Sequence, residues 1–505
     1  MVKVKAIITL LALSRLAFSI PAGDSAASLI ACLAASNVPL ISTSDADYAP
    51  AVIPYNLRLP FFPAAIAVPT TAAHVSSAIK CAQTFNTKVA ARSGGHSYAA
   101  FGLGGVDGSL MIDMKKFRNL TVDPDTFVAT VGAGLRLGDI ASGIYGIAGR
   151  ALPHGSCPGV GISGHALHGG FGYASRMWGT TLDNIIEMEV VLASGEIVNV
   201  SKESNPDLFW ALRGAGSSFG IVTTFKLKTY PAPASGINFT WAWTLDNSDT
   251  ATVDTKVKLF QAIQDYAVTT APSNMALGVF TSPMDGLFQV TGVFWGSRED
   301  FDSVIAPLIA SFPDQDNIPT PAVLEYAYLD LLVVLANGQA LPQPENYTMH
   351  DTFFAKSIVA PSKLTTNALT SFFTFHGQNA NKPPLLWFVI ANLYGGQYSA
   401  ISAQDPADSS YYARDSLFTF QLYSYVVGTT YPPSGIEFMD QLSKSMTDAQ
   451  TETKFHAYPN YVDPTLSPQL AHELYYGENY PRLASLKGVF DPGFLLWNPQ
   501  AVGTS

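Results

Sequence analysis

Two glycine-rich segments carry the residues best suited to chemistry on a bound ligand. In "ARSGGHSY", residues 91–98, Gly94 and Gly95 precede His96. In "HGSCPGVG", residues 154–161, Cys157 lies among glycines. Residues without a Cβ allow a backbone to approach a flat or anionic ligand closely. The segments therefore indicate ligand-binding loops, in which His96 is held at a fixed point and Cys157 is either a nucleophile or an inert buried thiol.

The second segment also matches the pattern G-x-G-x-x-G at Gly159, Gly161 and Gly164, with Asp183 about 20 residues later. The dinucleotide motif requires an apolar strand before the glycines and a helix that opens at them. Here "RALPHGSCP" precedes the glycines, and more glycines follow in "HALHGGFG". This context argues against a Rossmann NAD site.

Short strands and helices must position these loops. Residues 62–93 predict a strand, a helix from Thr71 to Asn86, and a strand that runs into the first glycine loop. Hairpins are predicted at 119–132 and 185–200, and a helix is predicted with Asn205 as its N-cap. The mixture is typical of an α+β fold rather than a regular parallel sheet.

The composition changes at "PAPASG", residues 231–236, where we predict a domain boundary. Alternating strands such as "GLFQVTGVFWG" and "LLWFVIANLYGG" follow, with helices between them. This pattern predicts an antiparallel sheet with helices on one face.

The overall composition excludes some partners. The chain has 505 residues, of which 48% are hydrophobic, and a net charge of -11, so we expect a large core and no nucleic-acid partner. Residues 1–19 combine a basic start with a short apolar run that Arg15 interrupts, which predicts a cleaved secretory signal and not a membrane helix. No other segment is expected to enter a membrane. Glycosylation sequons lie at Asn119, Asn199, Asn238 and Asn346.

The chain has three cysteines, which is an odd number for an oxidising compartment. Cys32 and Cys81 lie in separate helix-like segments. A disulfide between them would close a loop of about 50 residues and contribute roughly 4 kcal/mol in the chain-entropy model. Cys157 would then remain as the free thiol.

Taken together, these segments resemble the flavin oxidases of the vanillyl-alcohol oxidase and p-cresol methylhydroxylase type, and specifically their berberine-bridge-enzyme-like branch. The resemblance covers most of the mature chain. It includes both glycine loops, "NPDLFWALRGAGSSFGIVT" and "YPRLASLKGVFDPGFLLWNPQ". It implies a two-part FAD-binding domain at 60–232, on which 20–59 and 457–505 pack, and a substrate-binding domain at 236–456.

The resemblance also implies FAD bound covalently at two points and no metal. His96 would bond to the flavin 8α-methyl group and Cys157 to flavin C6. Gly94 and Gly95 would leave the backbone N–H groups of 93–97 free to meet the pyrophosphate. Further cofactor contacts are expected from Arg92, Ser93, Ser97, Gly155, Val160, Gly161, Gly164, His165, Gly169, Gly220, Ile221, Val222 and Asn460.

Oxidation of an alcohol by a flavin needs a base for the hydroxyl proton while hydride passes to N5. In the secreted fungal oligosaccharide oxidases, which this chain resembles, a tyrosine in a stretch like "PNYVD" is that base, and it maps to Tyr461. A phenol has a pKa of about 10 in solution, so we expect a nearby charge or the flavin to lower it. The alternative is a tyrosine of the core. Tyr98 is similarly either a wall residue of the site or packing.

The chain departs from those oxidases on one strand. Where their pattern has aspartate, glutamine and tryptophan, this chain has Asn392, Ile390 and Phe388. Asn392 could orient Tyr461 by a hydrogen bond but could not supply charge, and Ile390 removes a polar contact for a sugar hydroxyl. With Gln421, these residues are expected to form the substrate wall, for a ligand less polar than a cello- or xylo-oligosaccharide.

Val160 matches a position at which a valine, in this family, admits oxygen near flavin C4a. We therefore predict a secreted, monomeric oxidase that oxidises an alcohol or carbohydrate hydroxyl and reduces O2 to H2O2. Phe388 and Ile390 favour one alternative, an oxidase that tailors a secondary metabolite. Asn392 favours another, a catalytically silent flavin-binding glycoprotein.

Overall fold

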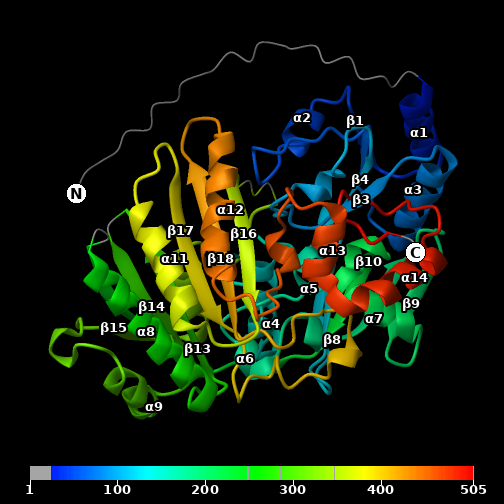
Figure 1. Ribbon diagram of the computed structural model, residues 1–505. Coiled ribbons are helices and arrows are strands. Elements are labelled where there is room, and N and C mark those ends of the chain that lie inside the picture. Colours follow the sequence, from blue (N-terminus) through cyan, green and yellow to red (C-terminus); the bar gives the residue numbers. More distant parts are fainter. Residues whose placement is uncertain (1–23, 247–248, 285, 346, 348, 504–505) are drawn as a thin grey trace.

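The computed structural model describes residues 24–246, 249–284, 286–345, 347 and 349–503. Two layered halves lie side by side (Figure 1). One half holds the predicted glycine loops together with both ends of the described chain, and the other is built on one large sheet. The predicted signal peptide at 1–19 and the sequon residue Asn346 lie outside the described residues. The α+β fold class predicted from the sequence is confirmed.

A four-stranded sheet carries the first glycine loop. Strands β2, β4 and β3 run parallel, and β1 pairs antiparallel with β2. The helix α3 connects β2 to β3 and begins where the Thr71 side chain accepts a hydrogen bond from His74 N, which is an N-cap. The elements are β1 (Leu40–Ser42), α2 (Tyr48–Ala51), β2 (Ala65–Ala67), α3 (Ala72–Thr84), β3 (Val89–Arg92) and β4 (Leu110–Asp113).

A second sheet of five antiparallel strands has the order β5-β6-β10-β8-β9. The second glycine loop follows β7 and enters α5. The elements are β5 (Leu120–Val122), β6 (Ala129–Gly132), α4 (Leu137–Ala148), β7 (Arg150–Ala151), α5 (Ile162–Ala166), α6 (Ser175–Trp178), β8 (Ile185–Val191), β9 (Ile197–Ser201), α7 (Pro206–Ala215), β10 (Ile221–Leu227) and β11 (Tyr230–Pro231).

One local prediction needs correction at the start of α7. Asn205 is at the N-cap position and Pro206 begins the helix, but the Asn205 side chain does not cap it. The residue has a φ of 54°, in the left-handed region, and its Nδ2 donates to Asn199 O at 3.0 Å. The side chain therefore ties the helix start to β9, which the local pattern did not predict.

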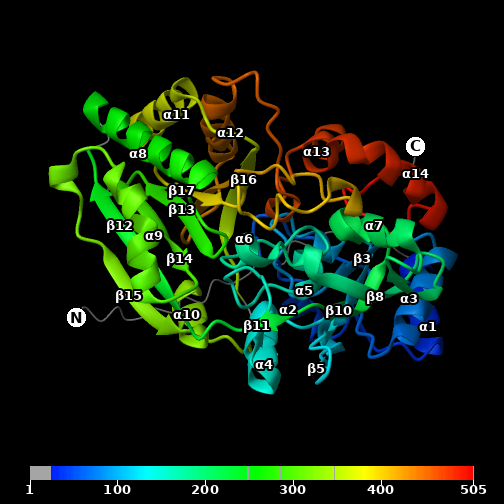
Figure 2. The same cartoon turned by 90° about the horizontal axis from the view of Figure 1, so that it is seen from below.

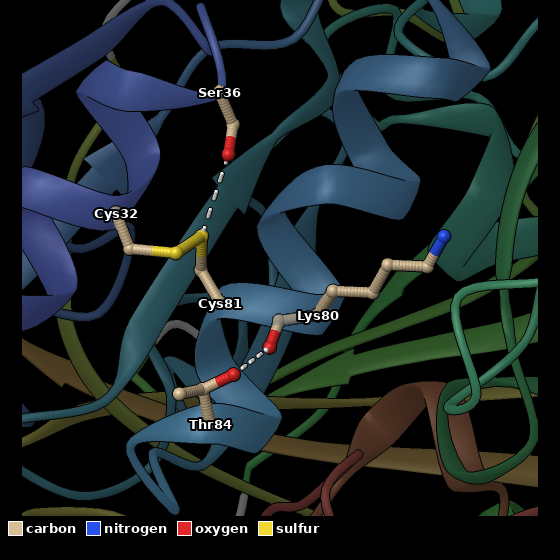
Figure 3. Close-up of a disulfide and its surroundings, with 5 residues drawn as sticks. All are labelled: Cys32, Ser36, Lys80, Cys81 and Thr84. Atoms are coloured by element: carbon tan, nitrogen blue, oxygen red, sulfur yellow. Dashed lines mark hydrogen bonds between the residues drawn. A yellow bond between two sulfur atoms is a disulfide. The ribbon is translucent and has the colours of Figure 1, made fainter.

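Both ends of the described chain join the core of this half. Leu29 of α1 (Asp24–Ala35) and Leu483 of α14 (Tyr480–Phe490) are buried in the same hydrophobic cluster as the two sheets, and α13 (Pro468–Tyr476) and α14 lie beside α7 (Figure 1). Figure 3 shows the disulfide between Cys32 and Cys81, whose Cα atoms are 5.8 Å apart. It joins α1 to α3 and confirms the predicted pairing.

The other half is a seven-stranded antiparallel sheet of order β15-β12-β14-β13-β17-β18-β16. Helices α8, α9, α11 and α12 cover one face (Figure 2) and share its core. The elements are β12 (Ser235–Thr244), α8 (Thr250–Thr269), β13 (Met275–Ser282), β14 (Leu287–Phe294), α9 (Arg298–Ala310), β15 (Ala322–Ala327), α10 (Tyr328–Leu335), β16 (Thr352–Ala360), α11 (Thr366–Gln378), β17 (Leu386–Leu393), β18 (Phe418–Val426) and α12 (Pro433–Thr447).

Within the described ranges, no helix combines the length and the apolar character needed to cross a bilayer. Of the sequons in those ranges, Asn119 and Asn199 are exposed, whereas Asn238 lies half-buried on β12.

Candidate active site

The two glycine loops meet backbone to backbone. A Cβ placed on Gly94 would lie 2.3 Å from Gly161 N, and a Cβ on Gly161 would lie 2.0 Å from Gly94 N. Neither position can therefore carry a side chain without moving the other loop. Ser93 Oγ donates to Ala133 O at 2.6 Å and fastens the first loop to the end of β6.

Other predicted cofactor residues of the first loop have structural partners. Arg92 forms an ion pair with Asp113 at 2.7 Å and donates to Ala51 O at 2.5 Å. Ser97 Oγ accepts a hydrogen bond from Phe101 N at 3.2 Å. These side chains hold the loop in shape, which leaves its backbone as the part available to a ligand.

His96 lies between two phenol rings. Its imidazole stacks on Tyr55 at 4.4 Å and on Tyr347 at 5.7 Å between ring centroids. The Nε2 atom is buried and has no hydrogen-bond partner. Burial lowers the pKa of His96 to about 4, and the charges of Arg136 and His350 act in the same direction. The imidazole is therefore neutral at pH 7, as it must be to bond to an electrophilic carbon.

Cys157 is a free, half-buried thiol on the second loop. Val160 N donates to the Cys157 carbonyl oxygen at 3.3 Å. Burial raises the pKa of the thiol, while the nearby groups of Gly159, Tyr347 and Val160 act against that rise. The Tyr347 ring, which stacks on His96, also lies against Gly159, two residues after Cys157, where a Cβ would be 2.3 Å from its Cζ.

The C-terminal segment is fastened to the second loop. Asn460 Nδ2 donates to His165 O at 3.0 Å and to the hydroxyl oxygen of Tyr458 at 2.9 Å. Gly155 N donates to Nε2 of the buried His165 at 3.2 Å, and burial lowers the pKa of this histidine to about 3. Gly169 has a φ of 121° and lies against Tyr458, where a Cβ would be 3.0 Å from the ring.

Three further predicted cofactor residues, Gly220, Ile221 and Val222, lie at the start of β10. The side chains of Ile221 and Val222 are buried in the core of this half. A Cβ on Gly220 would lie 2.4 Å from Val190 Cγ1 of the next strand. Their side chains pack within the protein, so contact with a ligand would have to come from the backbone.

Tyr461 and Tyr98 meet where the two halves join. Their rings stack at 5.6 Å with an angle of 8°, and Gln421 Nε2 donates to the Tyr98 hydroxyl at 2.6 Å. Tyr461 ends a short 3-10 turn, Pro459–Tyr461, and its ring stands edge-on to Tyr458 at 5.0 Å. In the part of the chain that the structure describes, no group hydrogen-bonds to the Tyr461 hydroxyl. That hydroxyl is free to bind a ligand.

The environment of Tyr461 differs from the one expected. Burial raises its pKa, and the neighbouring phenols of Tyr458 and Tyr173 raise it further. The structure also shows no hydrogen bond between Asn392 and Tyr461; the Asn392 amide has no partner among the described residues, and its Oδ1 lies above Gly278. Neither the lowered pKa nor the orienting contact is therefore present in the protein by itself.

The open face of the large sheet forms an aromatic wall beside Tyr98. Phe388 and Ile390 of β17 pair across the strands with Tyr423 and Gln421 of β18. The Phe388 ring stacks on Tyr423 at 5.1 Å and on Phe280 of β13 at 5.5 Å. The predicted substrate residues are thus brought onto one surface.

Sequence reasoning missed several residues of the site. Tyr55 and Tyr347 carry no local motif, since each reaches the site from a distant part of the chain, whereas Tyr458 directly precedes the "PNYVD" stretch. Lys356 of β16 donates to Asp463 at 2.6 Å and so fastens the Tyr461 segment to the large sheet. The aspartate of "PNYVD" was the one available signal for that ion pair.

The paired loops, the two nucleophiles and the separate sheet define a flavin-linked oxidoreductase. A family profile described as "FAD binding domain" matches residues 63–201, and one described as "Berberine and berberine like" matches 457–503. The chain is 38% identical to a "Carbohydrate oxidase" of Microdochium nivale over 484 residues, which are 94% of each chain. It belongs to the berberine-bridge-enzyme-like FAD-linked oxidases, close to fungal oligosaccharide oxidases, and the predicted resemblance is confirmed.

Solved structures agree with this assignment. The xylooligosaccharide oxidase from Myceliophthora thermophila C1 in complex with xylobiose superposes with a TM-score of 0.89 at 36% identity, over 95% of this chain and 99% of that one. A glucooligosaccharide oxidase from Acremonium strictum, described with a 6-S-cysteinyl, 8α-N1-histidyl FAD, has a TM-score of 0.89 at 32% identity, over 95% and 99%. The present chain is an FAD-dependent oxidoreductase, and His96 and Cys157 are the residues available for covalent bonds to FAD.

Proposed function

We propose that this chain is a secreted, bicovalently flavinylated oxidase that oxidises a carbohydrate or other alcohol hydroxyl and reduces O2 to H2O2. The observation that supports this most is the unpartnered Tyr461 hydroxyl, which lies beside an aromatic wall at the junction of the two halves. FAD, tethered through His96 and Cys157, supplies the hydride acceptor.

In this proposal, Tyr461 receives the proton of the substrate hydroxyl. Burial raises its pKa, so its phenolate is a strong base once it forms. Among the described residues, no cation is a cause of a lower pKa at Tyr461, which leaves the bound cofactor as the source of the compensating interaction. Tyr98, held by Gln421 and stacked on Tyr461, keeps the phenol in its plane. Val160 is proposed to admit oxygen.

The wall supports a ligand with both apolar and polar faces. The rings of Phe280, Phe388 and Tyr423 offer stacking surface, and Gln421 is a polar group next to Ile390. Similar proteins are a carbohydrate oxidase and a xylooligosaccharide oxidase, which favours a sugar among such ligands. The apolar residues Phe388 and Ile390 favour a ligand that is less polar than a cello- or xylo-oligosaccharide.

A peroxide-coupled screen tests this proposal. Purified enzyme would be offered mono- and oligosaccharides in parallel with aromatic alcohols, and H2O2 would be measured. We expect turnover of at least one sugar. Turnover of aromatic alcohols alone would identify a secondary-metabolite tailoring oxidase, and no turnover with fully flavinylated protein would identify a silent flavin-binding glycoprotein.

Secretion rests on the N-terminal signal, the disulfide and the sequons. The mature protein is expected to begin after Ser19 and to run as a monomer in size-exclusion chromatography. Endoglycosidase treatment should lower its mass if Asn119 or Asn199, both exposed, carries glycans. Retention of residues 1–19 in protein recovered from the medium would contradict the signal assignment.

A further inference from the structure

A pocket lies at the C-terminal edge of the FAD-binding half, apart from the site described above. It has a volume of about 750 Å³ and is bordered mainly by α13, the start of α14 and residues 494–503. Figure 2 shows α13, α14 and the C-terminal end together. We call this hollow the C-terminal pocket. Sites for small ligands commonly have volumes of about 300–1,000 Å³, and none of the described residues that line this one belongs to the glycine loops or the aromatic wall.

Contacts within the protein hold the walls of the C-terminal pocket in place. Trp497 N donates to Val89 O of β3 at 3.1 Å and so joins one wall to the four-stranded sheet. Another wall contains the Tyr480 ring, which stacks on His472 of α13 at 4.2 Å. His472 Nε2 lies 3.2 and 3.0 Å from two carbonyl oxygens of the C-terminal segment. Because a carbonyl only accepts, this nitrogen carries the hydrogen and donates it. The pocket is therefore formed before any ligand binds.

Trp497 offers the pocket an aromatic face that the protein does not use. Its side chain is half-buried and lines the pocket. In the part of the chain that the structure describes, its ring stacks on no other ring and its Nε1 has no hydrogen-bond partner. Tryptophan is enriched at binding surfaces because it presents a large apolar ring together with one polar N–H group. Both parts of Trp497 are therefore available to a ligand.

Polar side chains line the same pocket. Gln469 and Glu473 are one turn apart on α13 and so lie on one face of that helix. Both are exposed, as is Glu478, and within the described ranges none of the three makes a side-chain hydrogen bond or an ion pair. Their amide and carboxylate oxygens can accept hydrogen bonds from hydroxyl groups. Two carboxylates against one lysine, Lys454, give the lining a negative balance that disfavours an anionic ligand.

We propose that the C-terminal pocket is a second carbohydrate-binding site, which holds a neutral saccharide without oxidising it. A pyranose ring has a face of C–H groups, which packs on an aromatic ring, and a rim of hydroxyl groups, which donate to carboxylates and amides. Trp497 supplies the first kind of contact, and Gln469 and Glu473 supply the second. A purely apolar ligand would instead remove these polar groups from water without giving them partners. The inference goes beyond the proposed function, because this site lies apart from the flavin attachment residues.

Affinity electrophoresis of the flavinylated protein tests this proposal. Native gels would contain neutral arabinoxylan, hydroxyethyl cellulose or no polysaccharide. At least one of the two polysaccharides should retard the wild type, because each presents sugar rings to the pocket. Trp497→Ala should weaken that binding about tenfold or more, as is typical of a tryptophan at the centre of a binding surface. The double variant Gln469→Ala with Glu473→Ala changes only exposed side chains, so it should fold normally and also bind more weakly.

Two matched variants show where the polysaccharide binds. Tyr398→Ala removes an aromatic side chain that is 51% exposed and lies outside the pocket, so this variant should migrate like the wild type. Phe388→Ala alters the aromatic wall of the active site, and its retardation should also be unchanged. Loss of retardation in Phe388→Ala, with normal retardation in Trp497→Ala, would assign the binding to the active site and overturn the proposal.

The remaining results also decide the question. A wild type that neither polysaccharide retards would overturn the proposal, and so would pocket variants that are all retarded like the wild type. A wild type that is retarded through Trp497 but oxidises no sugar in the peroxide screen would keep the C-terminal pocket and overturn the carbohydrate part of the proposed function.

Discussion

Lys356 fastens the segment that carries Tyr461 to the large sheet. Its Nζ donates to Asp463 Oδ2 at 2.6 Å and to Asp440 Oδ1 at 2.5 Å. The side chains of Lys356 and Asp463 are 13% and 5% exposed, whereas that of Asp440 is 43% exposed. The ion pair with Asp463 is therefore the one expected to stabilise the fold, since exposed ion pairs contribute little to the free energy of unfolding.

Replacing Lys356 with Met removes the charge and keeps an unbranched apolar side chain of similar length. Removing one partner of a buried ion pair costs about 3–5 kcal/mol, because the other charge is left without compensation. Asp463 keeps two hydrogen bonds from Thr465 at its Oδ1, so we expect the lower end, a loss of about 3 kcal/mol in unfolding free energy.

The stabilisation by Lys356 has a defined pH window. Burial acts to lower its pKa, but Asp463 and Asp440 raise it overall above the ordinary value of 10.5. A raised folded-state pKa means that the stabilisation is complete below the unfolded pKa and is lost as pH rises through the folded one. The deficit of Lys356→Met should therefore be constant between pH 6 and 9.

Urea unfolding measures this effect. The double variant Lys356→Met with Asp463→Asn should recover at least half of the lost unfolding free energy, because the unpaired carboxylate has been removed. Lys363→Met breaks an exposed pair with Asp265 and should cost less than about 0.5 kcal/mol. A Lys356→Met protein as stable as the wild type, or a double variant no more stable than the single one, would show that this ion pair does not stabilise the fold.

Three further predictions follow from the site and its supports. Gly161→Ala should abolish FAD incorporation, since its Cβ would lie 2.0 Å from a backbone nitrogen. A Cβ on Gly146 would have no atom within 4 Å, so Gly146→Ala should incorporate FAD normally, as measured by flavin absorbance. Replacing Cys32 and Cys81 with Ser should lower the unfolding free energy by roughly 4 kcal/mol without changing flavin content. Because the pKa of His96 is about 4, its covalent uptake of FAD by apoprotein should be constant from pH 6 to 8 and fall toward pH 4; a midpoint near 6.5 would contradict this.

The sequence predicted those features that near neighbours decide. The strand, helix and strand before His96 follow from hydrophobic spacing and the Thr71 cap, and the glycine loops follow from the need for backbone contact. The order and pairing of cysteines left Cys157 as the free thiol.

Contacts across the chain were beyond local patterns. Tyr347 lies about 250 positions after His96 in sequence, and the structure alone brings its ring to that imidazole. Asn205 illustrates the same limit at short range, because its left-handed backbone is set by its contact with β9 and not by the helix that it precedes. Asn392 was predicted to orient Tyr461, but the strand register puts it opposite Gly278 and Thr419 instead.

Tyr461 is proposed as the base of a flavin-dependent oxidation. Anaerobic stopped-flow reduction of the flavin by a sugar identified in the peroxide screen tests it directly, with wild type and Tyr461→Phe compared at equal covalent flavin content. We predict that the wild-type flavin is bleached and that the variant, with an unchanged absorbance spectrum, is reduced about 10²–10⁴ times more slowly. Reduction of Tyr461→Phe at the wild-type rate would exclude Tyr461 as the base.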